Sequence, residues 1–124
     1  MKGGSPIKRF ILEFGMGVDF HGQDVNRAAE KAVLDAISRS CLCGLQEILD
    51  IDDFNEQVAV NVTLSVSRPE EIDEDRIKKC LPIGKKKVTA VKGGLQIPGL
   101  YIPEFGDKDN SIEAALACVE VEIL

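Results

Sequence analysis

Residues 10–24, FILEFGMGVDFHGQD, contain the only histidine of the chain and set the pattern from which its fold and its candidate site follow. The stretch alternates with a period of two, as a β-strand does, because successive strand side chains point to opposite faces. One face is apolar and holds Phe10, Leu12, Phe14, Met16, Val18 and Phe20. The other face holds Arg9, Ile11, Glu13, Gly15, Gly17, Asp19 and His21. We therefore predict a strand whose apolar face joins the core and whose second face forms a site.

The second face combines bare glycine positions with a carboxylate and an imidazole. Glycine inside a strand usually marks a bulge, or a place where a ligand or another backbone comes close. Side chains two positions apart in a strand lie side by side, so Asp19 and His21 would reach a single cation. Gly22 and Asp24 then open a helix, whose free N–H groups and positive dipole end favour an anion such as phosphate. A metal and an anion are therefore both candidate ligands.

The predicted site has catalytic, substrate-binding and metal-binding members. The candidate catalytic residues are Asp19, His21 and Glu13, although Glu13 lies about 20 Å back along an extended strand unless the glycine segment bends. The candidate substrate-binding residues are Gly15, Gly17, Gly22 and Asp24. Asp19 and His21 are also the candidate metal ligands, for Zn, Mn or Mg. A third ligand would come from Glu13, Asp24, a cysteine, water or a neighbouring subunit.

A structural interpretation of the same residues stays open beside this one. Asp19 and Asp24 would cap a turn and a helix, and His21 would hydrogen-bond a backbone carbonyl. The glycines would then serve only to turn the chain.

Length and composition indicate one globular domain over residues 1–124, with a loose tail at residues 1–5. Hydrophobic residues make up 44% of the 124 positions and charged residues 29%, which are ordinary values for a folded domain. The formal net charge of -6 argues against a nucleic-acid surface. The one basic run, Lys85 to Lys87, is typical of a guarded strand edge, with a phosphate clamp as the alternative.

The sequence contains no membrane span and no apolar signal-peptide core, so we expect a cytoplasmic protein without membrane contact. The four cysteines are at no zinc-finger spacing, and most are expected to be small buried side chains. Cys43 or Cys118 would be a soft third metal ligand.

The remaining elements follow from periodicity. A helix is predicted after Asp24, with alanines on its buried face and Gly44 at its end. Residues 45–56 show no sustained period, so no element is predicted there. Strands are predicted at residues 58–66, 85–92 and 112–123, with a short helix after Asp73. The order β-α-β-α-β-β predicts an α+β domain with a mixed four-stranded sheet and helices on one face.

Residues 93–110 form a long segment rich in glycine and proline that also carries apolar side chains. These are Leu95, Ile97, Leu100, Tyr101, Ile102 and Phe105. Loops of this length inside a compact domain are usually functional or docked. We expect an ordered arm that packs on a partner subunit, or a lid over the site.

This order of elements resembles the Bacillus chorismate-mutase-like fold, whose members commonly form trimers with ligand sites between subunits. Residues 15–22, GMGVDFHG, resemble the GxGxDxHG signature of an uncharacterised family of small proteins. The Asp-x-His element also resembles that of 2-C-methylerythritol 2,4-cyclodiphosphate synthase, in which it holds a divalent metal. That resemblance implies that Asp19 and His21 are ligands. The chain lacks the synthase's second histidine and its downstream His-Ser-Asp-Gly-Asp pattern, so its activity is not transferred.

Together these features predict a small-molecule enzyme that acts on a phosphorylated or carboxylated metabolite at a subunit boundary. Metal or protonated His21 would neutralise the anion, and Asp19 or Glu13 would orient it or move a proton. The alternatives are a metabolite-binding oligomer without catalysis and a purely structural oligomer. A trimer-based homo-oligomer is expected in each case, because no helix of this chain covers the second face of the sheet.

Overall fold

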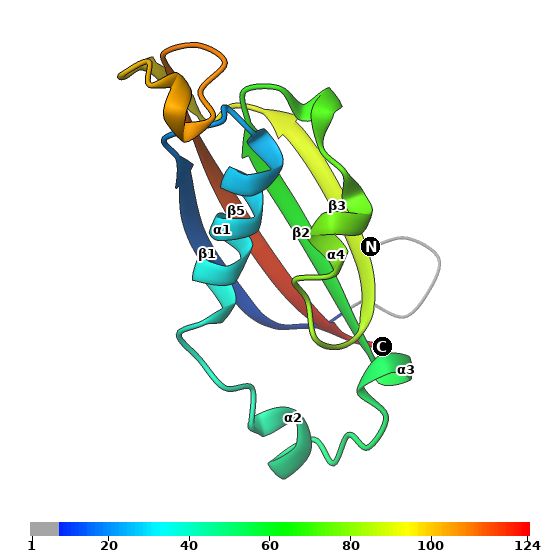
Figure 1. Cartoon of the computed structure of the whole chain (residues 1–124). Coiled ribbons are helices and arrows are strands. Elements are labelled where there is room, and N and C mark those ends of the chain that lie inside the picture. The colour runs from blue at the N-terminus through cyan, green and yellow to red at the C-terminus, as the bar shows by residue number, and fades with distance from the viewer. Residues whose placement is uncertain (1–7) are drawn as a thin grey trace.

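The structure, a computed structural model, describes residues 8–124 (Figure 1). The predicted tail at residues 1–5 lies outside the described residues. In chain order the elements are β1 (Lys8–Asp19), α1 (Val25–Ile37), α2 (Gly44–Glu47), α3 (Phe54–Gln57), β2 (Val58–Val66), η1 (Pro69–Glu71), α4 (Glu74–Lys78), β3 (Lys85–Lys92), β4 (Leu95–Pro98), η2 (Pro103–Phe105) and β5 (Ser111–Ile123).

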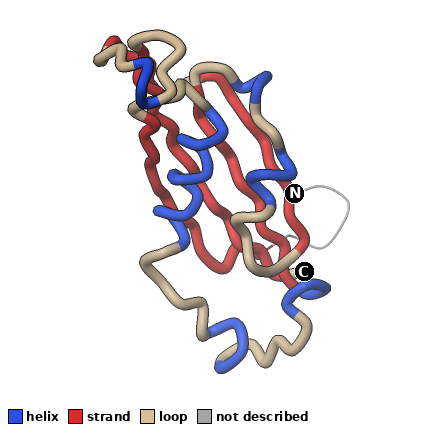
Figure 2. The backbone as a smooth tube through the Cα atoms, in the orientation of Figure 1, coloured by secondary structure: helices blue, strands red, loops and turns tan. Residues whose placement is uncertain are grey.

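The strands form one open, mixed sheet in the order β1-β5-β2-β3 (Figure 2). The last strand, β5, lies antiparallel between β1 and β2, whereas β3 runs parallel to β2. The short strand β4 pairs antiparallel with the first residues of β5, beyond the point where the pairing with β2 ends. The predicted α+β class and mixed sheet are confirmed. The sheet has five strands rather than four, because part of the predicted arm forms β4.

Helices α1 and α4 lie on one face of the sheet (Figure 1). Asp24 is the N-cap of α1, as predicted, and accepts a hydrogen bond from the Asn26 N–H at 2.9 Å. The buried face of α1 consists of Val25, Ala28, Ala29, Ala32, Val33 and Ala36. The helix ends at Ile37, and Gly44, its predicted end, instead begins α2. Residues 45–56, for which no element was predicted, include the rest of α2 and most of α3.

The glycines of β1 allow α1 to lie directly against the strand. A methyl group on Gly15 would stand 2.3 Å from the Ala32 carbonyl oxygen, and one on Gly17 would stand 2.2 Å from the Ala28 carbonyl oxygen. Real Cβ atoms essentially never approach other atoms so closely. Both glycines are therefore covered by helix backbone, and the prediction that they contact a substrate is wrong.

The prediction of the core face of β1 is also wrong. Phe14, Met16 and Phe20 are 65%, 56% and 57% exposed, and Leu12 is also exposed. The glycine face lies under α1, where Glu13 and Asp19 are buried. The apolar side chains of β1 therefore lie mainly on the open face of the sheet. This is the face opposite α1 and α4 (Figure 1).

The predicted arm is folded onto its own chain, although its apolar side chains stay in contact with solvent. Besides β4 it contains the short helical turn η2, and Asp107 near its end is buried. Leu95, Leu100 and Phe105 are 56%, 71% and 62% exposed. Within residues 8–124, no helix is long and apolar enough to cross a membrane.

Candidate functional site

His21 lies within hydrogen-bond distance of Asp107, a residue that the sequence did not single out. The Nδ1 atom of His21 lies 3.0 Å from both carboxylate oxygens of Asp107. The Asp107 side chain is fully buried, whereas the His21 side chain is 36% exposed. The ring also contacts Phe105 edge to face, with 5.0 Å between the ring centroids. The arm thus contributes two groups that fix the histidine ring.

The surroundings of Asp107 keep its carboxylate ionised. Burial alone would raise its pKa, but hydrogen bonds from His21, the Ile102 N–H, the Gln23 amide and the Gly22 N–H outweigh burial and lower the pKa to about 2. An ionised carboxylate only accepts hydrogen bonds, so Nδ1 of His21 must be the donor. The second ring nitrogen, Nε2, has no hydrogen-bond partner among residues 8–124.

The turn between β1 and α1 brings these groups together. Gly22 and Gln23 both adopt positive φ angles, of 95° and 52°. The second value is unusual for a residue with a side chain and costs conformational energy. Gln23 is held by its own side chain, which donates to Asp107 and to the Ser111 carbonyl and accepts from the Lys108 N–H at 2.8 Å. Gln23 therefore connects the turn to the arm.

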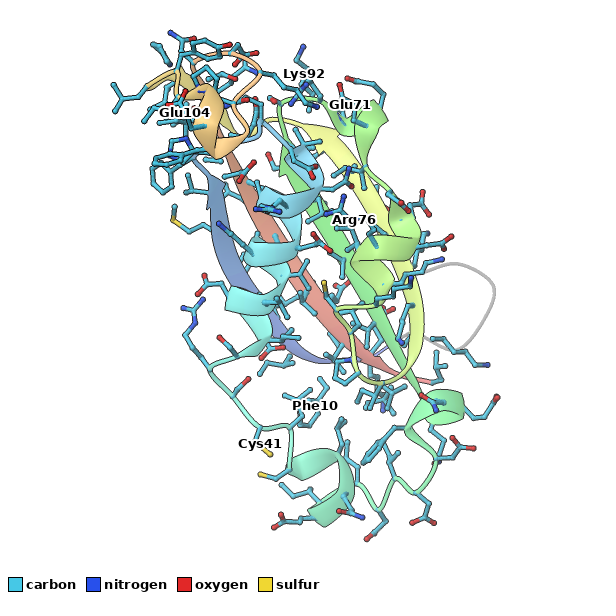
Figure 3. All side chains as sticks on the ribbon, viewed as in Figure 1. Phe10, Cys41, Glu71, Arg76, Lys92 and Glu104 are labelled. Atoms are coloured by element: carbon cyan, nitrogen blue, oxygen red, sulfur yellow. The ribbon has the colours of Figure 1, made fainter. Side chains whose placement is uncertain are left out.

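Asp19 and Asp24 have structural contacts in this turn. Asp19 is buried at the end of β1, and its Oδ2 accepts the Asp24 N–H at 2.9 Å. Asp24 caps α1 and lies 3.4 Å from the guanidinium of Arg76 on α4. Burial opposes ionisation of Asp24, but the Asn26 N–H and Arg76 outweigh it and lower its pKa. Figure 3 shows Arg76 on α4, facing α1.

Asp19 and His21 do not share a partner in this arrangement. The strand ends at Asp19 and the chain turns before His21, so the extended spacing that would aim both side chains at one ion is lost. Asp19 hydrogen-bonds the turn, whereas His21 contacts Asp107. Glu13 is separate from both, because it lines a different cavity near the C-terminal end of α1.

A cavity of about 320 Å³ opens beside His21, at the N-terminal end of α1. It is lined by His21, Gly22, Gln23, Asp24, Arg27, Arg68, Glu71, Phe105, Gly106 and Lys108. Arg68 donates to the Gln23 carbonyl at 2.7 Å and pairs with Glu71 at 3.3 Å. The side chains of Arg27 and Lys108 form no ion pair within the described chain. Two cationic groups thus remain available at the cavity.

The residues of this site do not assemble a metal centre by themselves. Within residues 8–124, no group of three or more His, Cys, Asp and Glu side chains is placed to hold a metal ion. Cys43 and Cys118, the predicted soft ligands, are not among the residues that line the cavity. The two carboxylates that line the cavity, Asp24 and Glu71, are paired with Arg76 and Arg68. The remaining side chains, those of His21, Arg27 and Lys108, suit an anion better than a cation.

Sequence reasoning missed Asp107, Gln23, Arg27, Arg68 and Lys108. The only signal for Asp107 and Lys108 was their place at the end of a long segment expected to be functional or docked. Arg27 is exposed on α1, and only the fold shows that the cavity reaches it.

The chain is matched by the family model described as "Conserved hypothetical protein (Lin0512_fam)" over residues 9–121. The chain belongs to the Lin0512 family. This confirms the expected membership of an uncharacterised family of small proteins. Among curated proteins, none matches this Lin0512-family chain.

One similar solved structure is that of an FtsZ-like protein of unknown function from Nostoc punctiforme. It is 38% identical to the present chain, with a TM-score of 0.87, and the match covers 97% of this chain and 98% of that one. The likeness therefore extends over the whole Lin0512-family domain, including the arm.

Proposed function

We propose that the cavity beside His21 binds a small phosphorylated or carboxylated metabolite and that His21 exchanges a proton with it. The observation that carries the proposal is a histidine fixed by a buried, ionised carboxylate at a cavity where Arg27 and Lys108 have no ion-pair partner. A cavity of about 320 Å³ is in the size range of small-molecule sites.

Each residue has a defined part in this proposal. Arg27 and Lys108 attract and hold the anionic group. Arg68, whose charge is paired with Glu71 and Glu113, holds the Gln23 carbonyl in place. Asp107 is a positioning residue, because it fixes the ring and the proton on Nδ1. Nε2 of His21 is then the atom that takes a proton from the ligand or gives one to it. Asp19 acts through the turn and does not contact the ligand.

The alternative without catalysis uses the same contacts. The cavity would then bind the metabolite as a regulatory or storage ligand, and the Asp107 network would serve only to fasten the arm.

A divalent metal is not part of our proposal, since the unpaired side chains that line the cavity favour an anion. A cytoplasmic location remains part of it and is supported by four cysteines that are all free.

Two resemblances noted in the sequence, the GxGxDxHG signature and the chorismate-mutase-like fold, also belong to this proposal. We take residues 15–22 to be an example of the GxGxDxHG signature. The two glycines allow α1 to pack directly against β1, Asp19 stabilises the turn through its hydrogen bond, and His21 faces the ligand. We likewise take the fold to be chorismate-mutase-like, which favours a trimer-based homo-oligomer.

The open face of the sheet supports an oligomer. Strand register places Met16 beside Leu116, and Leu95 and Ile97 beside the first residues of β5. The open-face patch, consisting of Leu12, Phe14, Met16, Leu95, Ile97 and Leu116, is thus continuous over three strands, and all six side chains are at least 42% exposed. Continuous apolar patches of this kind usually mark interfaces.

The edge of β1 is closed to a further strand, so a second copy would pack on the face. Asp35 accepts the Met16 N–H at 2.9 Å, and Arg39 and Lys31 donate to the carbonyls of Phe14 and Val18. Side chains of α1 therefore occupy the backbone groups that a pairing strand would need.

We expect inorganic phosphate to stabilise the wild-type protein against thermal unfolding and the double variant Arg27→Gln/Lys108→Gln to lose that response. Each replacement removes one positive charge from the cavity and no ion pair, so the fold should persist. Loss of two charge-assisted contacts corresponds to roughly a hundredfold weaker binding or more. Differential scanning fluorimetry across phosphate concentrations gives the affinity.

The control is Lys86→Gln/Lys87→Gln, which removes the same charge near the start of β3, at the opposite end of that strand from Lys92 and Glu71 (Figure 3). It should respond to phosphate as the wild type does. An equal response in all three proteins, or none in the wild type, would contradict an anion site here.

We expect Phe14→Glu/Leu116→Glu to convert the oligomer to monomer, because it places two buried charges in the proposed contact between copies. Sedimentation velocity measures the change. Leu34→Glu is the control, since Leu34 is 49% exposed on the outer side of α1. If the wild-type protein sediments as a monomer at all concentrations, the proposed oligomer is wrong, and the anion site belongs to a single chain.

A further inference from the structure

A second cavity, of about 440 Å³, lies at the opposite end of α1 from His21 and takes no part in the proposed function. Its floor is formed by Val60, Val119 and Val121 of the sheet, and its walls include Ile37, Leu42 and Ile83. Figure 3 shows Cys41, which also lines it, in the chain between α1 and α2. Its apolar lining and its volume are those of a small-molecule site.

The carboxylate of Glu13 also lines this mostly apolar cavity. Glu13 of β1 is only 9% exposed, and Ser40 donates a hydrogen bond to its Oε2. A carboxylate accepts about four hydrogen bonds, so most of its capacity is left. Within residues 8–124, no Lys, Arg or His lines the cavity, and Glu13 forms no ion pair. Buried charges in proteins are normally paired, and here the partner is missing.

We propose that this cavity binds a small apolar molecule that carries a protonated amine, with the amine on Glu13 and Ser40 and the apolar body on the valine floor. Charge complementarity favours this class of ligand, because the charged residues that line the cavity within residues 8–124, Glu13 and Glu47, are both acidic. An apolar acid would bring a second negative charge to Glu13, and an apolar alcohol would leave the charge of Glu13 unpaired.

The proposal is tested with three probes of similar size: 2-phenylethylamine, 2-phenylethanol and 3-phenylpropanoate. Isothermal titration calorimetry should show the amine binding at least about tenfold more tightly than the alcohol, and the acid more weakly than either. Glu13→Gln keeps the size of the side chain and removes its charge, so it should abolish the preference for the amine. Glu47→Gln, at the exposed rim, should keep that preference.

A second measurement needs no variant and uses the cysteines at the cavity. Cys41 and Cys43 line the cavity and are exposed, so the bound amine should slow their alkylation by iodoacetamide but leave Cys118 unaffected. The proposal is overturned if the three probes bind alike, if none binds, or if Glu13→Gln retains the preference. It is also overturned if alkylation without probe slows as protein concentration rises, since a second copy would then fill the cavity.

Discussion

Gly17→Ala is expected to lower the free energy of unfolding by about 3 kcal/mol or more, the upper part of the range for overpacked sites. The added methyl group would stand 2.2 Å from the Ala28 carbonyl oxygen and 2.4 Å from the Ala32 backbone nitrogen. Neither atom belongs to a side chain that could rotate away, so the whole of α1 would have to move outward. Gly15→Ala should act in the same way, against Ala32 and Ala36. Urea denaturation followed by circular dichroism measures the loss.

Thr63→Ala is the control for this experiment. Thr63 lies on the exposed side of β2, where removing a side chain should change the free energy of unfolding by about 0.5 kcal/mol or less. A Gly17→Ala protein as stable as the control would show that α1 does not lie against the strand as described.

Asp107→Asn is expected to release the arm at residues 93–110. The amide cannot accept from His21, Gln23 and two backbone N–H groups as the carboxylate does, and it carries no charge. Trypsin should then cleave after Lys108 at least about tenfold faster than in the wild type, because local opening exposes the arm to the protease. Glu104→Gln, at an exposed position in η2 of the same arm, is the control and should leave the rate close to wild type.

The same carboxylate predicts a dependence on pH. The folded state lowers the pKa of Asp107 from 3.8 to about 2, so its contribution to stability is complete above about pH 4. The contribution is lost as the pH falls from about 4 through about 2. Digestion with pepsin should therefore begin at the arm over this range in the wild type, whereas the Asp107→Asn arm should already be open at pH 4. An arm equally protected in both proteins at pH 4 would contradict the role of Asp107.

The sequence predicted the order of elements because the period-two strands and the alanine-rich helix are strong local signals. The side of β1 that faces the core was predicted wrongly for a physical reason. The apolar residues of a strand are assumed to be buried, but here α1 lies so close that Gly15 and Gly17 replace side chains with bare backbone. Phe14 and Met16 are consequently left on the open face.

The candidate site could be predicted only in part. His21 was identified because it is the single histidine in an unusual motif, and Asp24 because caps have a local signature. Asp107 lies 86 positions from His21, and no periodicity links the two residues. The assignment of Asp19 to an ion shared with His21 assumed that the strand continues, whereas the chain turns after Asp19.

In the proposed site, His21 is fixed by Asp107 and faces the bound anion. Because His21 is the only histidine, a long-range proton–nitrogen NMR spectrum of nitrogen-15-labelled protein reports its ring without further assignment. The proposed site requires the neutral ring to carry its proton on Nδ1. Phosphate should shift the Nε2 resonance in a saturable way in the wild type but not in Arg27→Gln/Lys108→Gln. A ring with its proton on Nε2, or ring resonances that stay unchanged while phosphate binds, would contradict the proposed site.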